Sequence, residues 1–205
     1  MNEIDLAADH EAAHALMRYR RGLPIAKITI DEDLINAEGV DARGYVSGVL
    51  MNKDVWEYLQ NLDDEREQKL LDWCIDSEIL AFLAGPVMDH LNSAQEYRVS
   101  GEQDDIGWAI DLIFHFQGGT DDLTPWQDRA KSLICESLPA IRRLASELKR
   151  QKTLGGAEAE AVLAIDTARD HEPVGDEILA IAARLKAEDV ANQAALRMTF
   201  GTGSP

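Results

Sequence analysis

Most of the chain carries apolar residues at helical spacing, in segments separated by Gly, Pro and short polar runs. The first segment contains no Gly or Pro from residue 6 to residue 21, with Asp5 as a candidate N-cap and Gly22 and Pro24 as a stop signal. This arrangement predicts a helix over 6–21. Further helices are predicted over 54–83 with a stop at Gly85-Pro86, over 86–92, over 104–116, over 125–151 with a bend at Pro139, over 157–164 and over 176–198.

Two short runs are rich in β-branched residues and predict strands instead of helices. Residues 25–30 alternate as Ile-Ala-Lys-Ile-Thr-Ile, and residues 44–50 form a second apolar run, Gly-Tyr-Val-Ser-Gly-Val-Leu. The acidic and polar residues 31–43 between them predict a turn or loop. The predicted fold class is therefore mainly α, a helical domain with a small β-hairpin or sheet after the first helix.

The length of the chain and a break at Pro and Gly residues predict one main domain with an appended tail. A chain of 205 residues can bury a good core as a single domain. The run Glu-Pro-Val-Gly over 172–175 then separates an Ala-rich helical stretch from the rest of the sequence. We therefore place a domain over 1–170 and a C-terminal helical tail over 171–205.

An excess of acidic residues narrows the classes of partner. The chain has 38 Asp and Glu against 20 Lys and Arg, a formal net charge of −18. Because phosphate backbones and anionic membranes attract basic surfaces, we expect neither a nucleic-acid partner nor a membrane partner. The longest apolar stretch, 79–88, is too short to span a membrane, and the acidic N-terminus lacks the basic region of a signal peptide.

The cysteines and tryptophans all fall in predicted helices. Cys74 and Cys135 stand singly, with no C-x-x-C pair, and we expect buried free thiols in a reducing, cytoplasmic protein. The aromatic residues are expected to pack in the core or between elements. The four tryptophans are Trp56, Trp73, Trp108 and Trp126.

Residues 10–14 read His-Glu-Ala-Ala-His, an H-E-x-x-H motif inside the first predicted helix. Side chains at i and i+4 share a helix face, so His10 and His14 can bind one metal ion. Glu11 extends from the adjoining part of the helix, where its carboxylate can act as a general base toward a water at the metal. Two imidazole ligands and a carboxylate base are the minimal set for zinc hydrolysis. The alternative is a pair of surface histidines on an amphipathic helix.

A third protein ligand must come from farther along the chain. The metzincin pattern requires Gly and His three and six residues after the second histidine, where this chain has Met17 and Arg20. Catalytic zinc sites usually combine three protein ligands with one open position for water. Taken alone, the residues leave four carboxylates as candidates, namely Asp104 and Asp105 at the start of a predicted helix, Glu78 and Asp89.

Four separated blocks resemble the zinc-peptidase domain of the FtsH family of ATP-dependent proteases, in the family's order. They are similar to its H-E-A-G-H-A, K-V-T-I, L-[AG]-G and T-G-A-x-x-D patterns, and the likeness covers about residues 6–165. The blocks are His-Glu-Ala-Ala-His-Ala-Leu over 10–16, Pro-Ile-Ala-Lys-Ile-Thr-Ile over 24–30 with Gly44-Tyr45 after it, Ile-Leu-Ala-Phe-Leu-Ala-Gly over 79–85, and Ser-Gly-Glu-Gln-Asp-Asp-Ile over 100–106.

The resemblance implies a Zn²⁺ site and a peptidase activity. In this family an aspartate of the fourth block completes the metal site, and the matching residue is Asp105. The implied ligands are therefore His10, His14 and Asp105, with Glu11 as general base. The implied substrates are peptides or unfolded protein segments, and zinc-peptidase architecture suggests that they lie along an edge of the 25–30 strand. The family's peptidase domains form rings, so a homo-oligomer is also implied.

The chain departs from the family in ways that bear on function. Ala13 replaces a Gly of the motif, and Pro86 and His90 interrupt the segment after the third block. No Gly-Lys pair occurs, so there is no Walker A loop, and the expected activity is independent of ATP. Two other functions stay open, a catalytically silent binding or regulatory module of this family and an H-E-x-x-H peptidase dedicated to one regulator.

Overall fold

The computed structural model describes residues 3–39, 42–48, 59, 62–92, 102–116 and 122–200. The structure is 74% helix with one small antiparallel sheet, which confirms a mainly α fold with a small sheet after the first helix. The elements are α1 (Glu3–Arg20), β1 (Lys27–Thr29), α2 (Glu32–Ala37), β2 (Tyr45–Ser47), α4 (Glu65–Asn92), α5 (Glu102–Phe116), α6 (Thr124–Glu136), α7 (Leu138–Gln151), β3 (Thr153–Gly155), α8 (Gly156–Leu163) and α9 (Gly175–Phe200).

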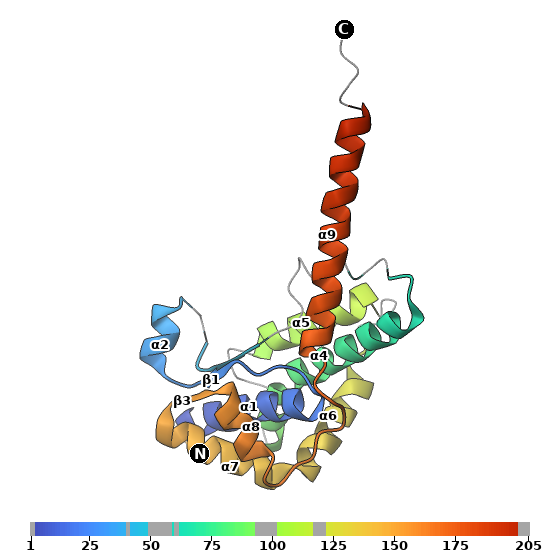
Figure 1. Cartoon of the computed structure of the whole chain (residues 1–205). Helices are drawn as coiled ribbons and strands as arrows, with labels where there is room; N and C mark the ends of the chain where they lie inside the picture. Colours follow the sequence, from blue (N-terminus) through green and yellow to red (C-terminus); the bar gives the residue numbers. More distant parts are fainter. Residues whose placement is uncertain are drawn as a thin grey trace.

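Helix α1 is the centre of the fold. Figure 1 shows it inside the body of the molecule, with α4, α7 and α8 around it. Every residue from Ala8 to Tyr19 is buried, and small residues such as Ala12 and Ala15 let the neighbouring helices pack close. A helix buried on all sides holds its polar side chains away from water, so these must find partners inside the protein.

Helix α4 continues without interruption through Gly85 and Pro86. The predicted stop at this pair is therefore wrong. A proline inside a helix cannot donate to the carbonyl four residues earlier, here that of Phe82, but the segment is buried between α1 and α5 and its packing outweighs the lost hydrogen bond. The helix begins at Glu65, whereas the predicted residues 54–61 lie mostly outside the described part of the chain.

Three short strands form an antiparallel sheet in the order β2-β1-β3. Ile28 of β1 pairs with Val46 of β2 on one side and with Leu154 of β3 on the other. Since β1 is the middle strand, the prediction of a substrate along an edge of the 25–30 strand is wrong. Strand β3 was not predicted, because its three residues become a strand only through pairing with a segment far away in sequence.

A short helix, α2, occupies part of the segment predicted as a loop over 31–43. Asp31 caps it, since the Asp31 carboxylate accepts hydrogen bonds from the backbone N–H groups of Asp33 and Leu34. Acidic side chains in the first turn, including Glu32, match the positive end of the helix dipole. The prediction of a loop is wrong over these residues, although the capping signal is present in the sequence.

The predicted helix over 125–151 is two helices, α6 and α7, which meet at Ser137. Pro139 lies in the first turn of α7, where a backbone N–H would have no helical partner.

Both cysteines are free thiols, Cys74 buried on α4 and Cys135 exposed on α6, so the expectation of burial is wrong for Cys135.

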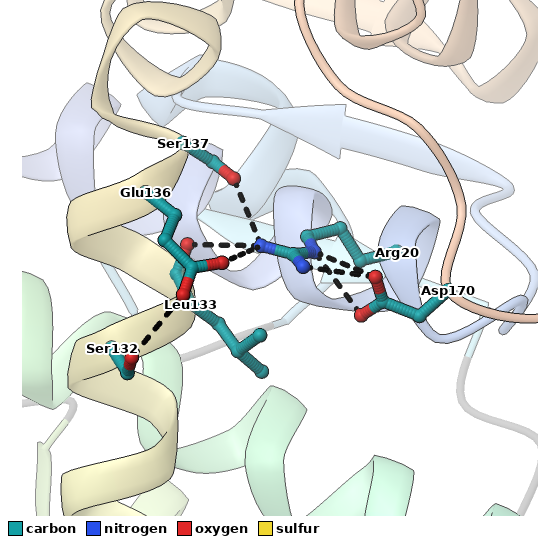
Figure 2. A network of polar contacts seen from close by, with 6 residues as sticks. All are labelled: Arg20, Ser132, Leu133, Glu136, Ser137 and Asp170. Atoms are coloured by element: carbon teal, nitrogen blue, oxygen red, sulfur yellow. Dashed lines mark hydrogen bonds and ion pairs between the residues drawn. The ribbon is translucent and has the colours of Figure 1, made fainter.

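Arg20, the last residue of α1, connects this helix with the end of α6 and with the segment before α9 (Figure 2). Its guanidinium donates to the Leu133 carbonyl, the Glu136 carboxylate and the Ser137 hydroxyl at 3.2 to 3.3 Å. On the other side it donates to the Asp170 carboxylate, at 2.9 Å for the shorter contact, and the Asp170 backbone N–H donates to the Arg20 carbonyl at 2.7 Å. These contacts fix the end of α1 against the end of α6 and against the segment that leads to α9.

Helix α9 extends away from the body of the molecule in Figure 1, and its first turns hold it in place. Ile178 is buried, and Arg184 pairs with Glu67 of α4 at 2.7 Å. The division into a domain over 1–170 and a tail over 171–205 stays a prediction. No helix in the described part of the chain is both long enough and apolar enough to cross a membrane.

Candidate metal centre

The H-E-x-x-H motif is buried, so the alternative of surface histidines is wrong. His10 and His14 lie one turn apart on α1, and their Nε2 atoms are 2.9 Å apart. Asp105, in the first turn of α5 and 95 residues from His10 in sequence, reaches the same point, with its Oδ2 at 3.3 Å from each Nε2. The ligand atoms of the three side chains all lie within 4.8 Å of one another, so this group could hold a metal ion.

Hydrogen bonds at the far side of each ring set the tautomers of the two histidines. His14 Nδ1 is 2.6 Å from the Ala81 carbonyl, which can only accept, so this nitrogen carries the proton. His10 Nδ1 is 2.7 Å from Oδ2 of Asp89 and donates to that carboxylate in the same way. Both rings therefore present an unprotonated Nε2 when neutral, which is the arrangement that metal-binding histidines use.

Gly85 makes room for the centre from α4. A Cβ on this residue would lie 2.3 Å from His14 Nε2 and 2.4 Å from His10 Nε2, closer than real side chains approach. The backbone of α4 therefore lies directly against both nitrogens. Only a residue without a side chain allows this close approach, which explains a glycine in the middle of a buried helix.

Carboxylates next to the imidazoles shift the pKa values of the centre. Burial by itself lowers the pKa of His10, but hydrogen bonds with Asp105 and Asp89 outweigh burial and raise it well above its ordinary value. The pKa of His14 is also raised, against burial, chiefly by the charge of Asp105. Burial favours the neutral form of Asp105, yet the two histidines hold its pKa well below the usual range. The centre therefore favours positive charge, which a divalent cation would supply.

Glu11 is buried beside the ligands and is held close to the sheet. Burial raises its pKa, although the neighbouring His10 and His14 oppose the shift. The residue before β2, Gly44, lies directly against it, since a Cβ there would be 2.7 Å from Cγ and 2.8 Å from Oε1 of Glu11. A side chain at position 44 would displace the carboxylate, so this glycine allows the start of β2 to approach Glu11.

The other candidate ligands are engaged elsewhere or lie outside the described part. Glu78 is fully buried and forms an ion pair with Arg18 at 2.7 Å. Asp89 lies behind His10, at Nδ1 and not at Nε2. The side chain of Asp104 is outside the part that the structure describes. Neither described alternative joins the three-residue group.

One tryptophan does not pack as expected. Trp73 and Trp126 are partly buried against the core, in agreement with the expectation, and Trp56 lies outside the described residues. Trp108, one turn after Asp105 on α5, is 58% exposed. The helical pattern over 104–116 does not predict this exposure, because it depends on how α5 packs in the folded chain.

Fold and site together define a mainly helical protein with a small antiparallel sheet and a candidate metal centre of two histidines and one carboxylate. No family model matches the chain, and no curated protein matches it either.

Proposed function

We propose that this protein is a zinc metallopeptidase that hydrolyses peptide bonds in peptides or unfolded protein segments without ATP. The observation that carries the proposal is the meeting of donor atoms from His10, His14 and Asp105 beside the buried carboxylate of Glu11. Independence from ATP rests on the lack of a Gly-Lys pair in the sequence, which a Walker A loop needs. The proposal would also make the chain a relative of the FtsH-type peptidase domains that it resembles.

The donor set suits Zn²⁺, which binds neutral imidazole nitrogens and carboxylate oxygens. Ferrous iron uses the same set in oxygenases, so the neighbouring residues must decide between the two. Glu11 favours zinc, because a buried carboxylate next to the ligands can serve as a proton acceptor in hydrolysis. When bound, Zn²⁺ would activate a water for attack and polarise the substrate carbonyl.

The burial of Glu11 beside the proposed ligands and the direction of its pKa shift support a role as general base. Burial raises its pKa, and a carboxylate with a raised pKa is a stronger proton acceptor. A Glu11 carboxylate oxygen would accept a proton from the attacking water and later donate it to the amide nitrogen that leaves. The peptide C–N bond breaks and the products are a carboxylate and an amine. His10 and His14 would transfer no proton, because Asp89 and the Ala81 carbonyl hold their Nδ1 protons.

Strand β2 is the proposed place for the substrate backbone, in place of β1. It is an edge strand of the described sheet, and it begins at Tyr45, next to the Gly44 that lies against Glu11. An extended peptide that adds to an edge strand gains backbone hydrogen bonds along its length. A peptide bound in this way would pass directly beside the general base.

Cleavage of an unfolded, fluorescently labelled casein by the zinc-loaded protein tests the proposal. Glu11→Gln is the background variant, because Glu11 is not one of the three proposed ligands and its loss should leave zinc bound. We expect this variant to lose a factor of about 100 to 10,000 in rate. Cleavage at the parent rate would remove Glu11 as the base. No cleavage by either protein would reject the proposed activity in favour of a silent binding module or a peptidase dedicated to one regulator.

A further inference from the structure

Two aromatic side chains, Trp108 on α5 and Phe82 on α4, stack next to the candidate metal centre. Their ring centroids are 6.3 Å apart, with an angle of 18° between the planes. Phe82 is partly buried against the core, whereas Trp108 is 58% exposed. Neither side chain takes part in the proposed chemistry. An exposed aromatic surface beside a candidate site is typical of a surface that binds a ligand or a substrate side chain.

The pair lies one helical turn from the metal centre along both helices. Trp108 follows Asp105 by three residues on α5, and Phe82 precedes Gly85 by three residues on α4. Residues three apart share a helix face. Because Asp105 and Gly85 both border the two Nε2 atoms, the two helices independently place the aromatic pair on the side of the centre.

Phe114 provides a comparison on the same helix. It is 66% exposed, slightly more than Trp108. It follows Asp105 by nine residues, which is about half a turn away around an α-helix. Phe114 therefore lies on the opposite side of α5 from the ligand, beside His115, with 5.9 Å between the ring centroids. Exposure is common to both aromatic residues, and only the position of Trp108 connects it with the centre.

We propose that Trp108 and Phe82 form a subsite that binds an aromatic or large aliphatic side chain of an unfolded polypeptide. This inference rests on the proposed peptidase function and specifies its substrates. Three residues of helix rise about 4.5 Å, and an extended peptide advances about 3.4 Å per residue. A segment with its scissile carbonyl at the centre would therefore place a side chain one or two residues away over the aromatic pair.

Shape and charge select the occupant. Aromatic rings bind other rings by offset stacking and bind aliphatic groups through the apolar area that they bury. Unfolded segments present such side chains, whereas folded proteins bury most of them. The net charge of −18 attracts segments that also carry Lys or Arg. The subsite thus fits an aromatic residue flanked by basic residues in an unfolded chain.

Binding of two short fluorescein-labelled peptides to the full-length, zinc-loaded Glu11→Gln protein tests this inference. One peptide carries a single Phe among Lys, Gly and Ser residues, and the other has Ser in place of the Phe. We expect fluorescence anisotropy to show tighter binding of the Phe peptide. Adding Trp108→Ala should weaken that binding about tenfold, Trp108→Phe should restore most of it, and Phe114→Ala should leave it unchanged.

Equal binding of the Phe peptide with and without Trp108→Ala would overturn the inference, and so would no preference of the parent for this peptide. Trp108→Phe covers the case in which alanine disturbs α5, because it keeps a ring at the position. A failure of the proposed function has a different signature, peptide binding that depends on Trp108 with no cleavage of casein. Cleavage of casein with no dependence of peptide binding on Trp108 would remove the subsite alone.

Discussion

Two clusters of buried polar side chains lie next to each other on α1, and they are built differently. In the histidine cluster, His10 and His14 face carboxylates, whereas in the arginine cluster Arg18 faces the fully buried Glu78. Arg18 donates to the two carboxylate oxygens of Glu78 at 2.7 and 3.2 Å and to the Pro24 carbonyl at 2.8 Å. In the arginine cluster each buried charge is therefore matched within the protein, as a structural ion pair requires.

The histidine cluster instead consists of side chains whose donor atoms converge on one point. Glu11, Asp89 and Asp105 lie around two imidazoles that carry no charge in their neutral form. Although burial opposes it, these carboxylates raise the pKa of both His10 and His14. Burial of charged groups is thus common to both clusters, and the convergence of donor atoms from His10, His14 and Asp105 on one point is what distinguishes the cluster that could hold a cation.

The largest effect is expected for Gly85→Ala, which should abolish metal binding at the histidine cluster and leave the arginine cluster unchanged. The new Cβ would lie within 2.4 Å of both Nε2 atoms, and the Nδ1 hydrogen bonds prevent the rings from moving aside. Zinc content after dialysis, measured by elemental analysis, checks the expectation. Gly107→Ala on α5 is the matched control, since a Cβ there has no described atom within 4 Å. The control should keep its zinc and gain about 0.5–1 kcal/mol of stability. Parent-level zinc in Gly85→Ala would place the metal elsewhere.

Glu78→Gln should damage the arginine cluster and leave zinc affinity unchanged. The variant buries the charge of Arg18 without its partner, which lowers the free energy of unfolding by about 3–5 kcal/mol. Urea unfolding of the metal-free protein measures the loss. Asp105→Ala is the opposite variant, with sharply weaker zinc binding. If Glu78→Gln lost its zinc while Asp105→Ala retained it, Glu78 would be the third ligand and the assignment here would be wrong.

Asp89→Asn should weaken zinc binding by about 10- to 100-fold, the effect expected of a residue that orients a ligand without touching the metal. The asparagine oxygen can still accept a hydrogen bond from His10 Nδ1, but because this oxygen is neutral, Nε2 becomes a weaker ligand for the metal. Competition with a chromophoric chelator gives the dissociation constant. Asp111→Asn, at an exposed position on α5, is the control and should leave the affinity unchanged. A loss as complete as that expected for Asp105→Ala would make Asp89 a ligand.

Features with a local cause could be predicted from the sequence. The spacing of His10 and His14 predicts that their side chains share a face of α1, because the helical repeat alone determines this. Asp105 is different, since no local pattern connects it with residues 95 positions earlier, and only the resemblance to a known family selected it. The α2 helix also has a local cause, the cap that Asp31 forms, so this helix could be predicted from the sequence.

The remaining misses come from contacts between distant segments. Gly85-Pro86 has the composition of a helix stop, but packing between α1 and α5 carries α4 through it and uses the glycine to make room for two histidines. Strand β3 exists through its pairing with β1. The exposure of Trp108 depends on how α5 packs on α4. Each of these features is a property of the assembled fold, which the local sequence cannot supply.

The smallest effect is expected in the rate of thiol labelling, which tests whether the two clusters open independently of each other. Burial, with the nearby charge of Glu78, raises the pKa of Cys74 to about 12, and only the thiolate form reacts readily with disulfide reagents. At about pH 8 we therefore expect only the exposed Cys135 to react quickly in the native protein, and both thiols to react in urea. Glu78→Gln should speed the labelling of Cys74, because it weakens the neighbouring arginine cluster, whereas Gly85→Ala should change it little. Equal acceleration by both variants would mean that the two clusters open together, and that the contrast between them concerns charge but not local stability.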